Sequence, residues 1–263
     1  MSDTPAARAV ESDRLLRNAW QYFARHLPGG GVVSLPGLVL ADGRSPLPFM
    51  NAAILTDPVA GADDLRGRLA KARRHFERHG LHWILMYAAD RTPPALDTAG
   101  LCAEAGLQYM MPMTGMVAAT LAPPVRRLPA LDLRAVDSAA TRQAVADLNA
   151  AGYDIPPEIV RPATAPESFW SNVTGVVGYV NDVPVSTASV VAVDDIAYVA
   201  LVATRPDRQG RGYAEAVMRH ALQQARADWG VSRTILHATP AGQPVYTRMG
   251  YADAGGFHVY VSE

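Results

Sequence analysis

The stretch PDRQGRGYAEAVMRHAL, Pro206–Leu222, joins a glycine-rich turn to the start of a helix. The helix is predicted by apolar residues that recur every three or four positions: Ala214, Val217, Met218, Ala221, Leu222 and Ala225. Gly210 and Gly212 stand at its start, where each costs about 1 kcal/mol relative to alanine. Such glycines let backbone N–H groups converge on an anion, and a helix N-terminus adds partial positive charge. We therefore predict a phosphate site, to which Arg208 and Arg211 add full charges.

The glycines alone do not decide between this site and a plain strand-to-helix turn with solvated arginines. Neither the Gly-x-Gly-x-x-Gly spacing of dinucleotide-binding folds nor Gly-x-x-x-x-Gly-Lys-Ser/Thr is present at this turn. The order of the neighbouring segments is more informative. The strand-like run AYVALVAT precedes the turn, and the strand RTILHAT and the segment AGQPVYTRMGY follow the helix.

This order resembles the GCN5-related N-acetyltransferase (GNAT) family. The family signature Gln/Arg-x-x-Gly-x-Gly/Ala is matched by Gln209, Gly212 and Ala214, and Tyr246 shortly before Met-Gly-Tyr is similar to the last conserved segment. The resemblance covers residues 131–263, about half of the chain. It implies an α/β (α+β) fold, in which a mixed, mostly antiparallel sheet is flanked by helices. The runs TGVVGYV, PVSTASVVAV and AYVALVAT, separated by Asn-Asp and Asp-Asp turns, also predict an antiparallel meander.

The resemblance also implies acetyl-CoA as the cosubstrate and assigns residues to it. The strand before the loop is expected to pair with the pantetheine arm, and the amides of the turn are expected to hold the pyrophosphate. Thr239 takes the place of an asparagine that often precedes the tyrosine by seven residues, which puts that contact in doubt. The expected cofactor-binding residues are Val202, Ala203, Thr204, Arg208, Gln209, Gly210, Arg211, Gly212, Tyr213, Ala214 and Thr239.

The implied reaction is transfer of an acetyl group from acetyl-CoA to a primary amine by direct attack in a ternary complex. This acyltransferase chemistry needs a base for the amine, a donor for the oxyanion and an acid for the leaving thiolate. Tyr246 is the expected acid, and a backbone N–H within residues 202–204 is the expected oxyanion donor. His237 is the candidate base. His258, Tyr198, Asp194, Asp195 or an ordered water are alternatives. Tyr246 could instead be a packed, half-buried aromatic residue.

The acceptor is expected to enter over the proline-broken stretch at residues 149–170, where the family is variable. The small-molecule or peptide amine would meet polar and aromatic candidates there: Tyr153, Asp154, Glu158 and Trp170. The sequence predicts no metal site and does not identify the acceptor or the oligomeric state.

The N-terminal half is similar to the C-terminal half in its order of helix, glycine and apolar strand. Aligning Cys102 with Tyr246 also aligns Gly106 with Gly250. We predict a tandem repeat with a degenerate GNAT-like domain at 1–121, a proline-rich linker at 122–130 and a catalytic domain at 131–263. The first copy has lost the phosphate site, because Asp63 and Asp64 stand at the corresponding helix start. Cys102 is expected to be buried and inert.

The composition limits the other function classes. The net charge is −1, and no run reaches the roughly 18 apolar residues of a membrane span. With a single cysteine and no apolar leader, we expect a cytoplasmic protein that binds neither nucleic acid nor membrane. Two alternatives are a non-catalytic acyl-CoA sensor and a nucleic-acid or protein-binding module that uses the basic face of the helix at 63–80, although a solvated face explains that helix better.

Overall fold

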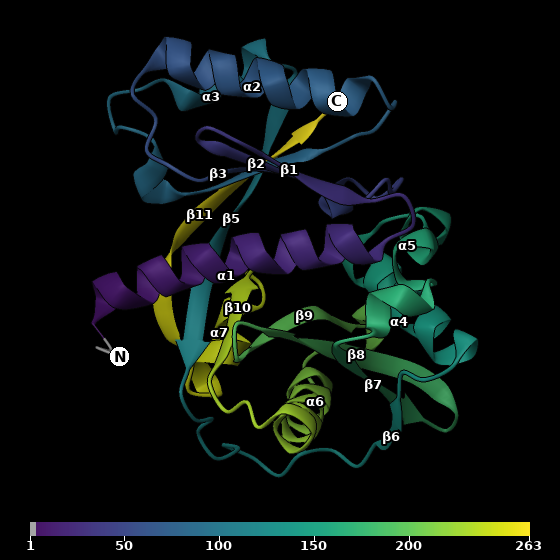
Figure 1. Cartoon of the computed structure of the whole chain (residues 1–263). Helices are drawn as coiled ribbons and strands as arrows, with labels where there is room; N and C mark the ends of the chain where they lie inside the picture. Colours follow the sequence, from purple (N-terminus) through teal and green to yellow (C-terminus); the bar gives the residue numbers. More distant parts are fainter. Residues whose placement is uncertain (1–3) are drawn as a thin grey trace. The chain divides into compact units, whose positions relative to one another are not determined.

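A computed structural model describes residues 4–263, which form two compact units (Figure 1). The first unit comprises the chain up to Gly115 together with His237–Ala241 and Asp253–Glu263. The second unit comprises Met116–Leu236 and Gly242–Ala252. The proline-rich stretch at 122–130 therefore lies within the second unit, and two segments that follow it in the sequence fold with the first.

In the first unit, the helix at 62–77 packs its apolar side on a sheet. Phe76 and Trp83 stack in its core with ring centroids 5.4 Å apart. Four apolar side chains of this helix, spaced three or four residues apart, are fully buried: Leu65, Leu69, Ala72 and Phe76. Its elements are α1 (Pro5–His26), β1 (Gly31–Leu35), β2 (Leu38–Asp42), β3 (Asn51–Leu55), α2 (Ala62–Glu77), β4 (Ile84–Ala88), α3 (Thr98–Glu104) and β5 (Leu107–Ala118).

The second unit begins with the end of β5, the proline-rich stretch and β6, and a helical pair then leads into the predicted meander. Asn181, Asp182, Asp194 and Asp195 all have φ between 48° and 60°, which is the left-handed backbone that two-residue hairpin turns require. Its elements are β6 (Asp132–Ala135), α4 (Ala139–Tyr153), α5 (Pro157–Thr164), β7 (Val173–Val180), β8 (Val183–Val193), β9 (Ile196–Thr204), α6 (Tyr213–Trp229), β10 (Thr234–Ala238) and α7 (Gln243–Arg248), followed by β11 (Ala252–Ser262).

Both units repeat one pattern of strand pairing. Strands β1, β2 and β3 pair antiparallel, and β3 then pairs parallel with β4 across α2. Strands β7, β8 and β9 pair antiparallel, and β9 pairs parallel with β10 across α6. In each series a short helix and a long strand follow, α3 with β5 and α7 with β11. The expected mixed, mostly antiparallel sheet flanked by helices is confirmed.

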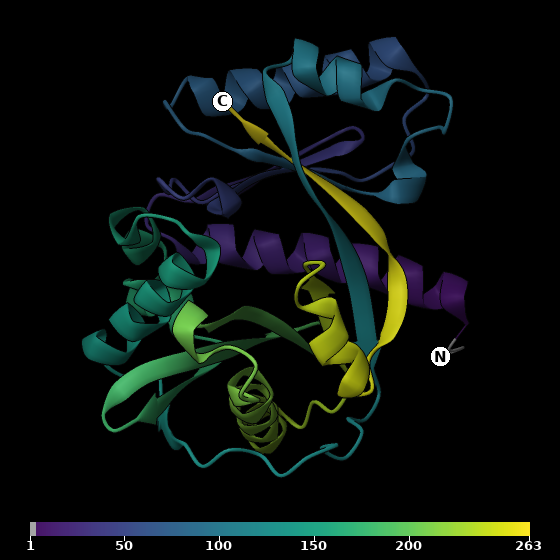
Figure 2. The same cartoon turned by 180° about the vertical axis from the view of Figure 1, so that it is seen from behind.

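The last strands of the two series are exchanged. The strand order is β1-β2-β3-β4-β11-β5 in the first unit and β5-β10-β9-β8-β7-β6 in the second, with β5 contributing to both. Strand β11 pairs antiparallel with β4, from Phe257 opposite Ala88 to Val261 opposite Ile84. Figure 2 shows β5 and β11 as long strands running side by side. None of the described helices is long and apolar enough to cross a membrane.

Candidate functional site

Strand β9 carries a bulge near its end. Leu201 has φ of 52°, and the pairing with β8 shifts by one residue there, because Ser189 lies opposite Ala200 whereas Thr187 lies opposite Ala203. A leucine in the left-handed region is uncommon and costs of order 1–2 kcal/mol. Bulges re-aim the strand and often lie beside active sites. The bulge falls directly before Val202, Ala203 and Thr204, the residues expected along the cofactor.

Helix α4 holds this bulge through two side chains one helical turn apart. The amide of Asn149 donates to the carbonyl of Val145 at 2.9 Å and to that of Leu201 at 3.4 Å. The hydroxyl of Tyr153 donates to the carbonyl of Val202 at 3.4 Å. Two carbonyls of the bulge thus have partners. Sequence reasoning named Tyr153 but missed Asn149, whose only signal was its spacing of four residues from Tyr153.

The edge of β9 that faces β10 is open beyond its first residues. Parallel pairing with β10 joins Ala197 to Thr234 and Tyr198 to Ile235. Among the described residues of the second unit, 199–204 of β9 form no further pair with β10. An unpaired strand edge offers N–H and C=O groups to an extended ligand.

The loop after β9 leads into an uncapped helix. Gly210 and Gly212 have φ of 72° and 82°, a backbone that only glycine adopts without strain. Gly212 is the N-cap of α6, and no side chain accepts a hydrogen bond from the helix start there. Glu215 lies in the first turn, but Arg219 binds its carboxylate at 2.8 Å. The first-turn amides therefore have no side-chain acceptor at the N-cap, as an anion site requires.

The arginines near this loop differ in how far their charge is neutralised. Arg205 and Arg208 share the carboxylate of Asp207, at 3.0 and 3.3 Å. Arg211 is exposed, and the amide of Gln209 donates to the carbonyl of Thr204 at 3.4 Å. Arg208, which the sequence analysis assigned to phosphate, thus already has an anionic partner.

Tyr246 lies in α7, half-buried, with its ring 6.0 Å from the ring of Tyr251 in an edge-to-face contact. Burial, and next the phenols of Tyr153 and Tyr251, raise the pKa of Tyr246. Tyr246 is therefore a neutral phenol at physiological pH, able to give a proton but not to take one. Because the phenol of Tyr153 contributes to the raised pKa of Tyr246, the predicted acid lies near one of the residues predicted to bind the acceptor.

The other acceptor candidates form no described hydrogen bond to the bulge, although Trp170 packs against the apolar cluster that includes Ala203. Trp170 donates its indole N–H to the carbonyl of Thr164 at 2.7 Å and packs over Gly175, where an added Cβ would lie 2.6 Å from its ring. Asp154 closes α4 with φ of 54°, and Glu158 is an exposed residue in the first turn of α5. Of the four candidates, Tyr153 is the one with a recorded hydrogen bond to β9.

His237 and Thr239 belong to the first unit, whereas Tyr246 belongs to the second. The Nε2 atom of His237 lies 3.1 Å from the hydroxyl of Ser12, and its ring meets the ring of Phe257 edge-on at 4.6 Å. Burial lowers the pKa of His237 to about 3. The imidazole is therefore neutral and only weakly basic. His258 is half-buried 5.3 Å from the ring of Tyr87, and burial also lowers its pKa.

The start of α2, which corresponds to that of α6, also has a glycine N-cap without a side-chain hydrogen bond, but its first turn carries the two carboxylates of Asp63 and Asp64. Asp64 accepts from the N–H of Ala60 at 2.9 Å and pairs with Arg68 at 2.7 Å. The hydrogen bond from Arg68, and next the N–H of Ala60, hold the pKa of Asp64 below its usual value. Cys102 is fully buried, and burial raises the pKa of its thiol to about 12, as expected for an inert cysteine.

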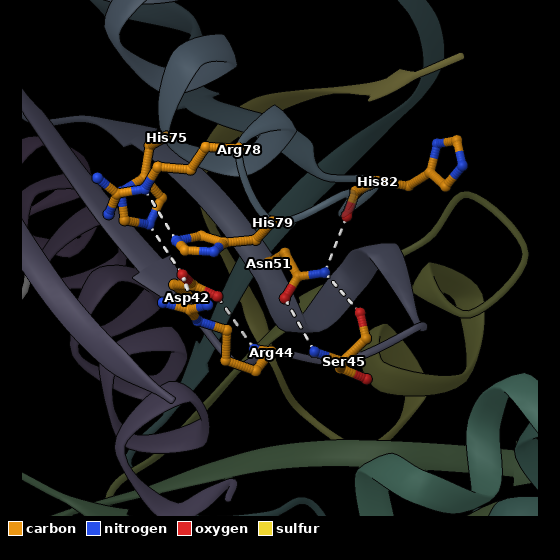
Figure 3. Close-up of polar contacts among 8 residues, drawn as sticks. All are labelled: Asp42, Arg44, Ser45, Asn51, His75, Arg78, His79 and His82. Atoms are coloured by element: carbon orange, nitrogen blue, oxygen red, sulfur yellow. Dashed lines mark hydrogen bonds and ion pairs between the residues drawn. The ribbon is translucent and has the colours of Figure 1, made fainter. Parts of the chain in front are cut away.

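A second polar cluster in the first unit surrounds the buried carboxylate of Asp42 (Figure 3). His75 lies 2.9 Å from it and Arg44 3.0 Å, and Arg78 joins His75 to His79 through contacts of 3.3 and 2.8 Å. These contacts fasten the end of α2 to the loop after β2. Among the described residues, no group of three or more histidine, cysteine or acidic side chains could hold a metal ion.

The basic face of α2 is largely paired within the unit. Arg66 binds Glu104 at 2.8 Å, and Arg73 binds Glu77 at 2.6 Å. Together with the Arg68–Asp64 pair, these contacts use much of the charge that a nucleic acid would need.

Comparisons with known proteins agree with this arrangement. Residues 142–251 match the sequence model of the acetyltransferase (GNAT) family. The chain is similar to a solved GCN5-related N-acetyltransferase from Kribbella flavida, with a TM-score of 0.69 and 20% identity over 95% of each chain. A putative acetyltransferase from the GNAT family of Novosphingobium aromaticivorans gives 0.59 and 16% over 98% of each chain. No curated protein matches the sequence.

A further structural neighbour is a tandem GNAT protein from the clavulanic acid biosynthesis pathway. It gives a TM-score of 0.51 and 15% identity, over 86% of this chain and 78% of that protein. At sequence identities of 20% or less, the solved structures show only that the fold is similar. The family assignment rests on the sequence-model match, which includes Gln209, Gly212 and Ala214. Residues 142–251 of this chain therefore belong to the GNAT acetyltransferase family.

Proposed function

We propose that the second unit binds acetyl-CoA and transfers its acetyl group to a primary amine. One observation carries this proposal: the uncapped start of α6, with left-handed Gly210 and Gly212, directly follows the bulged end of β9, which pairs with β8 but, within the second unit, has no pair with β10. The residues present fit the phosphates of a coenzyme, because first-turn amides lack a side-chain acceptor and no Cβ fills the turn at either glycine. Val202, Ala203 and Thr204 would lie along the pantetheine arm.

The bound thioester supplies the acetyl group and a thiolate leaving group. During transfer the amine nitrogen forms a bond to the carbonyl carbon, the carbon–sulfur bond breaks, and a proton reaches the sulfur. Tyr246 is proposed to hold that proton on its hydroxyl, since its raised pKa keeps the phenol protonated. A backbone N–H at the bulge is proposed to donate to the carbonyl oxygen.

Proton removal from the attacking amine is assigned to water. A proton from water then restores the Tyr246 hydroxyl, so that in net one proton passes from the amine to the sulfur. His237 was the candidate base, but an imidazole whose pKa is lowered to about 3 has little tendency to keep a proton near neutral pH. The acceptor is proposed to approach Tyr153, because this hydroxyl contacts the bulge and influences Tyr246.

The first unit is proposed to be a degenerate copy of the same fold. The support is the shared pairing pattern, together with the carboxylates that stand at the start of α2. Asp63 and Asp64 favour the helix dipole but repel a phosphate. The first unit would then be structural.

The test is acetyl-CoA-dependent acetylation of a panel of primary amines. Release of free CoA thiol is followed together with the mass of the acetylated amine. The single cysteine, Cys102, is buried and contributes no thiol signal from the folded protein. We expect turnover with at least one amine. Saturable acetyl-CoA binding without turnover on any amine would favour the acyl-CoA sensor, and absence of binding would contradict the proposal altogether.

A further inference from the structure

The segment between β5 and β6, residues 119–131 and here called the strap, is fastened to the second unit near its start. The guanidinium of Arg219 in α6 donates to the carbonyl of Ala122 at 2.7 Å. The N–H of Ala122 donates to the carbonyl of Met249 at 2.8 Å. Figures 1 and 2 show the strap passing along α6 on its way to β6. Its prolines suggested a plain linker, but these contacts hold it against the candidate site.

The strap places an arginine over the glycine loop. Arg126 donates from Nη2 to the carbonyl of Gly210 at 3.2 Å. A Cβ built on Gly212 would lie 3.4 Å from Nη2 of Arg126 and 3.6 Å from its Nε. The guanidinium therefore lies against the first residues of α6, where the uncapped amides begin.

The charge of Arg126 is not neutralised by any recorded ion pair among the described residues. Arg208 pairs with Asp207, and Arg219 pairs with Glu215, whereas the recorded partner of Arg126 is a neutral carbonyl. A guanidinium has five N–H donors in a planar fork and binds phosphate oxygens in pairs. Hydrogen bonds to a charged acceptor are about twice as strong as those to a neutral one. A phosphate at the helix start would therefore compete well with the Gly210 carbonyl.

We propose that Arg126 is a phosphate-binding residue of the acetyl-CoA site and grips the pyrophosphate from the side opposite the loop amides. The inference rests on the proposed function of the second unit. It favours the pyrophosphate over the 3′-phosphate, because Arg126 contacts the two glycines whose neighbouring amides would bind the pyrophosphate. The coenzyme would then be held by α6 and by the strap together.

Calorimetry on the full chain with three ligands tests this assignment. CoA carries both phosphate groups, dephospho-CoA keeps only the pyrophosphate, and pantetheine has neither. The wild type is compared with Arg126→Ala, with Arg126→Lys and with Arg127→Ala, an exposed neighbour without a recorded contact to the loop. Equal Tm values verify that the variants are folded.

We expect Arg126→Ala to weaken CoA and dephospho-CoA roughly tenfold each, with pantetheine unaffected. Arg126→Lys should recover part of the loss, and Arg127→Ala should change affinity by less than about threefold. Unchanged CoA affinity in Arg126→Ala would overturn the inference while leaving the proposed function intact. A loss of affinity for CoA but not for dephospho-CoA would overturn the pyrophosphate assignment. Equal losses of affinity in Arg126→Ala and Arg127→Ala would also overturn it, because the effect would then be general electrostatic attraction. If the wild type does not bind CoA, the proposed function fails, and the inference fails with it.

Discussion

Helices α2 and α6 follow equivalent strands in the same pairing pattern, yet their first turns differ in charge and in backbone conformation. At α2 a carboxylate, Asp64, accepts a backbone N–H and binds Arg68, which also donates to the carbonyls of Gly37, Asp57 and Pro58. Both helices have a glycine N-cap without a side-chain hydrogen bond, but Gly212 of α6 is left-handed, whereas Gly61 of α2 is extended. The one acidic residue in the first turn of α6, Glu215, is bound by Arg219. This difference supports the proposal that one topology gives a structural helix start in the first unit and an anion site in the second.

The difference teaches that the fold alone does not create the ligand site. The difference lies in two short stretches. The first turn of α2 carries two carboxylates, whereas the start of α6 has two left-handed glycines and one carboxylate that is paired with Arg219. The comparison also separates stability from binding: the first turn of α2 should matter for folding, and that of α6 for the coenzyme.

The largest expected effect on stability comes from Arg68→Ala. The change leaves a carboxylate and three carbonyls without their donor in a nearly buried place, so the free energy of unfolding should fall by roughly 3–5 kcal/mol. Denaturant titration measures it. Arg211→Ala is the counterpart at α6 and should change stability by less than about 0.5 kcal/mol while weakening acetyl-CoA binding. Equal stability losses in the two variants would break the comparison.

The second comparison uses Tyr246 and Cys102, which are aligned with each other in the two halves of the sequence. Tyr246→Phe should reduce kcat on the order of 100-fold and leave acetyl-CoA affinity unchanged, because only the proton donor is removed. Steady-state kinetics and calorimetry provide the two readouts. Cys102→Ser, made in the first unit, should leave kcat within about twofold of the wild type. An active Tyr246→Phe enzyme would argue that the phenol only packs against Tyr251.

The pH dependence of folding should report His237. Its pKa is lowered from 6.5 in the unfolded chain to about 3 in the folded protein, so the unfolded state binds the proton first as pH falls. The contribution of His237 to the free energy of unfolding is fully present above pH 6.5 and is lost as pH falls from 6.5 towards 3. Tm measured across this range should fall less steeply in His237→Gln than in the wild type. Parallel curves would show that the folded imidazole titrates normally.

The smallest expected signal is the reactivity of Cys102. With its pKa raised to about 12, the buried thiol should not react with an aromatic disulfide reagent at pH 8 in the folded protein, and it should react fully in denaturant. Rapid labelling of the native protein would mean that the first unit opens at this position.

Much of the second unit could be predicted from local sequence. The apolar spacing gave α6, the paired acidic and amide residues gave the hairpin turns, and the spacing of Gln209, Gly212 and Ala214 located the helix start. These features depend on residues a few positions apart. Neither the bulge at Leu201 nor its support by Asn149 could be predicted, since both depend on strand register and on a helix about 50 residues away.

The exchange of β5 and β11 was also outside the reach of sequence reasoning. Each strand follows a short helix, α3 or α7, and nothing in the local sequence determines which strand it will pair with. The same applies to His237, whose partner Ser12 lies 225 residues away in the sequence. The composition of the strap did not predict its contacts. Its prolines indicated a linker, and nothing in the local sequence placed Arg126 beside the glycine loop.

The most direct test of the account is the stoichiometry of acetyl-CoA binding by calorimetry, in the wild type, Gly212→Asp and Gly212→Asn. Asparagine and aspartate both tolerate the left-handed backbone and differ in charge alone. The account predicts one equivalent bound per wild-type chain, and binding by Gly212→Asp at least tenfold weaker than by Gly212→Asn, because a carboxylate repels the phosphates. Two equivalents per chain, or equal affinity in the two variants, would contradict the claim that the start of α6 is the chain's phosphate site.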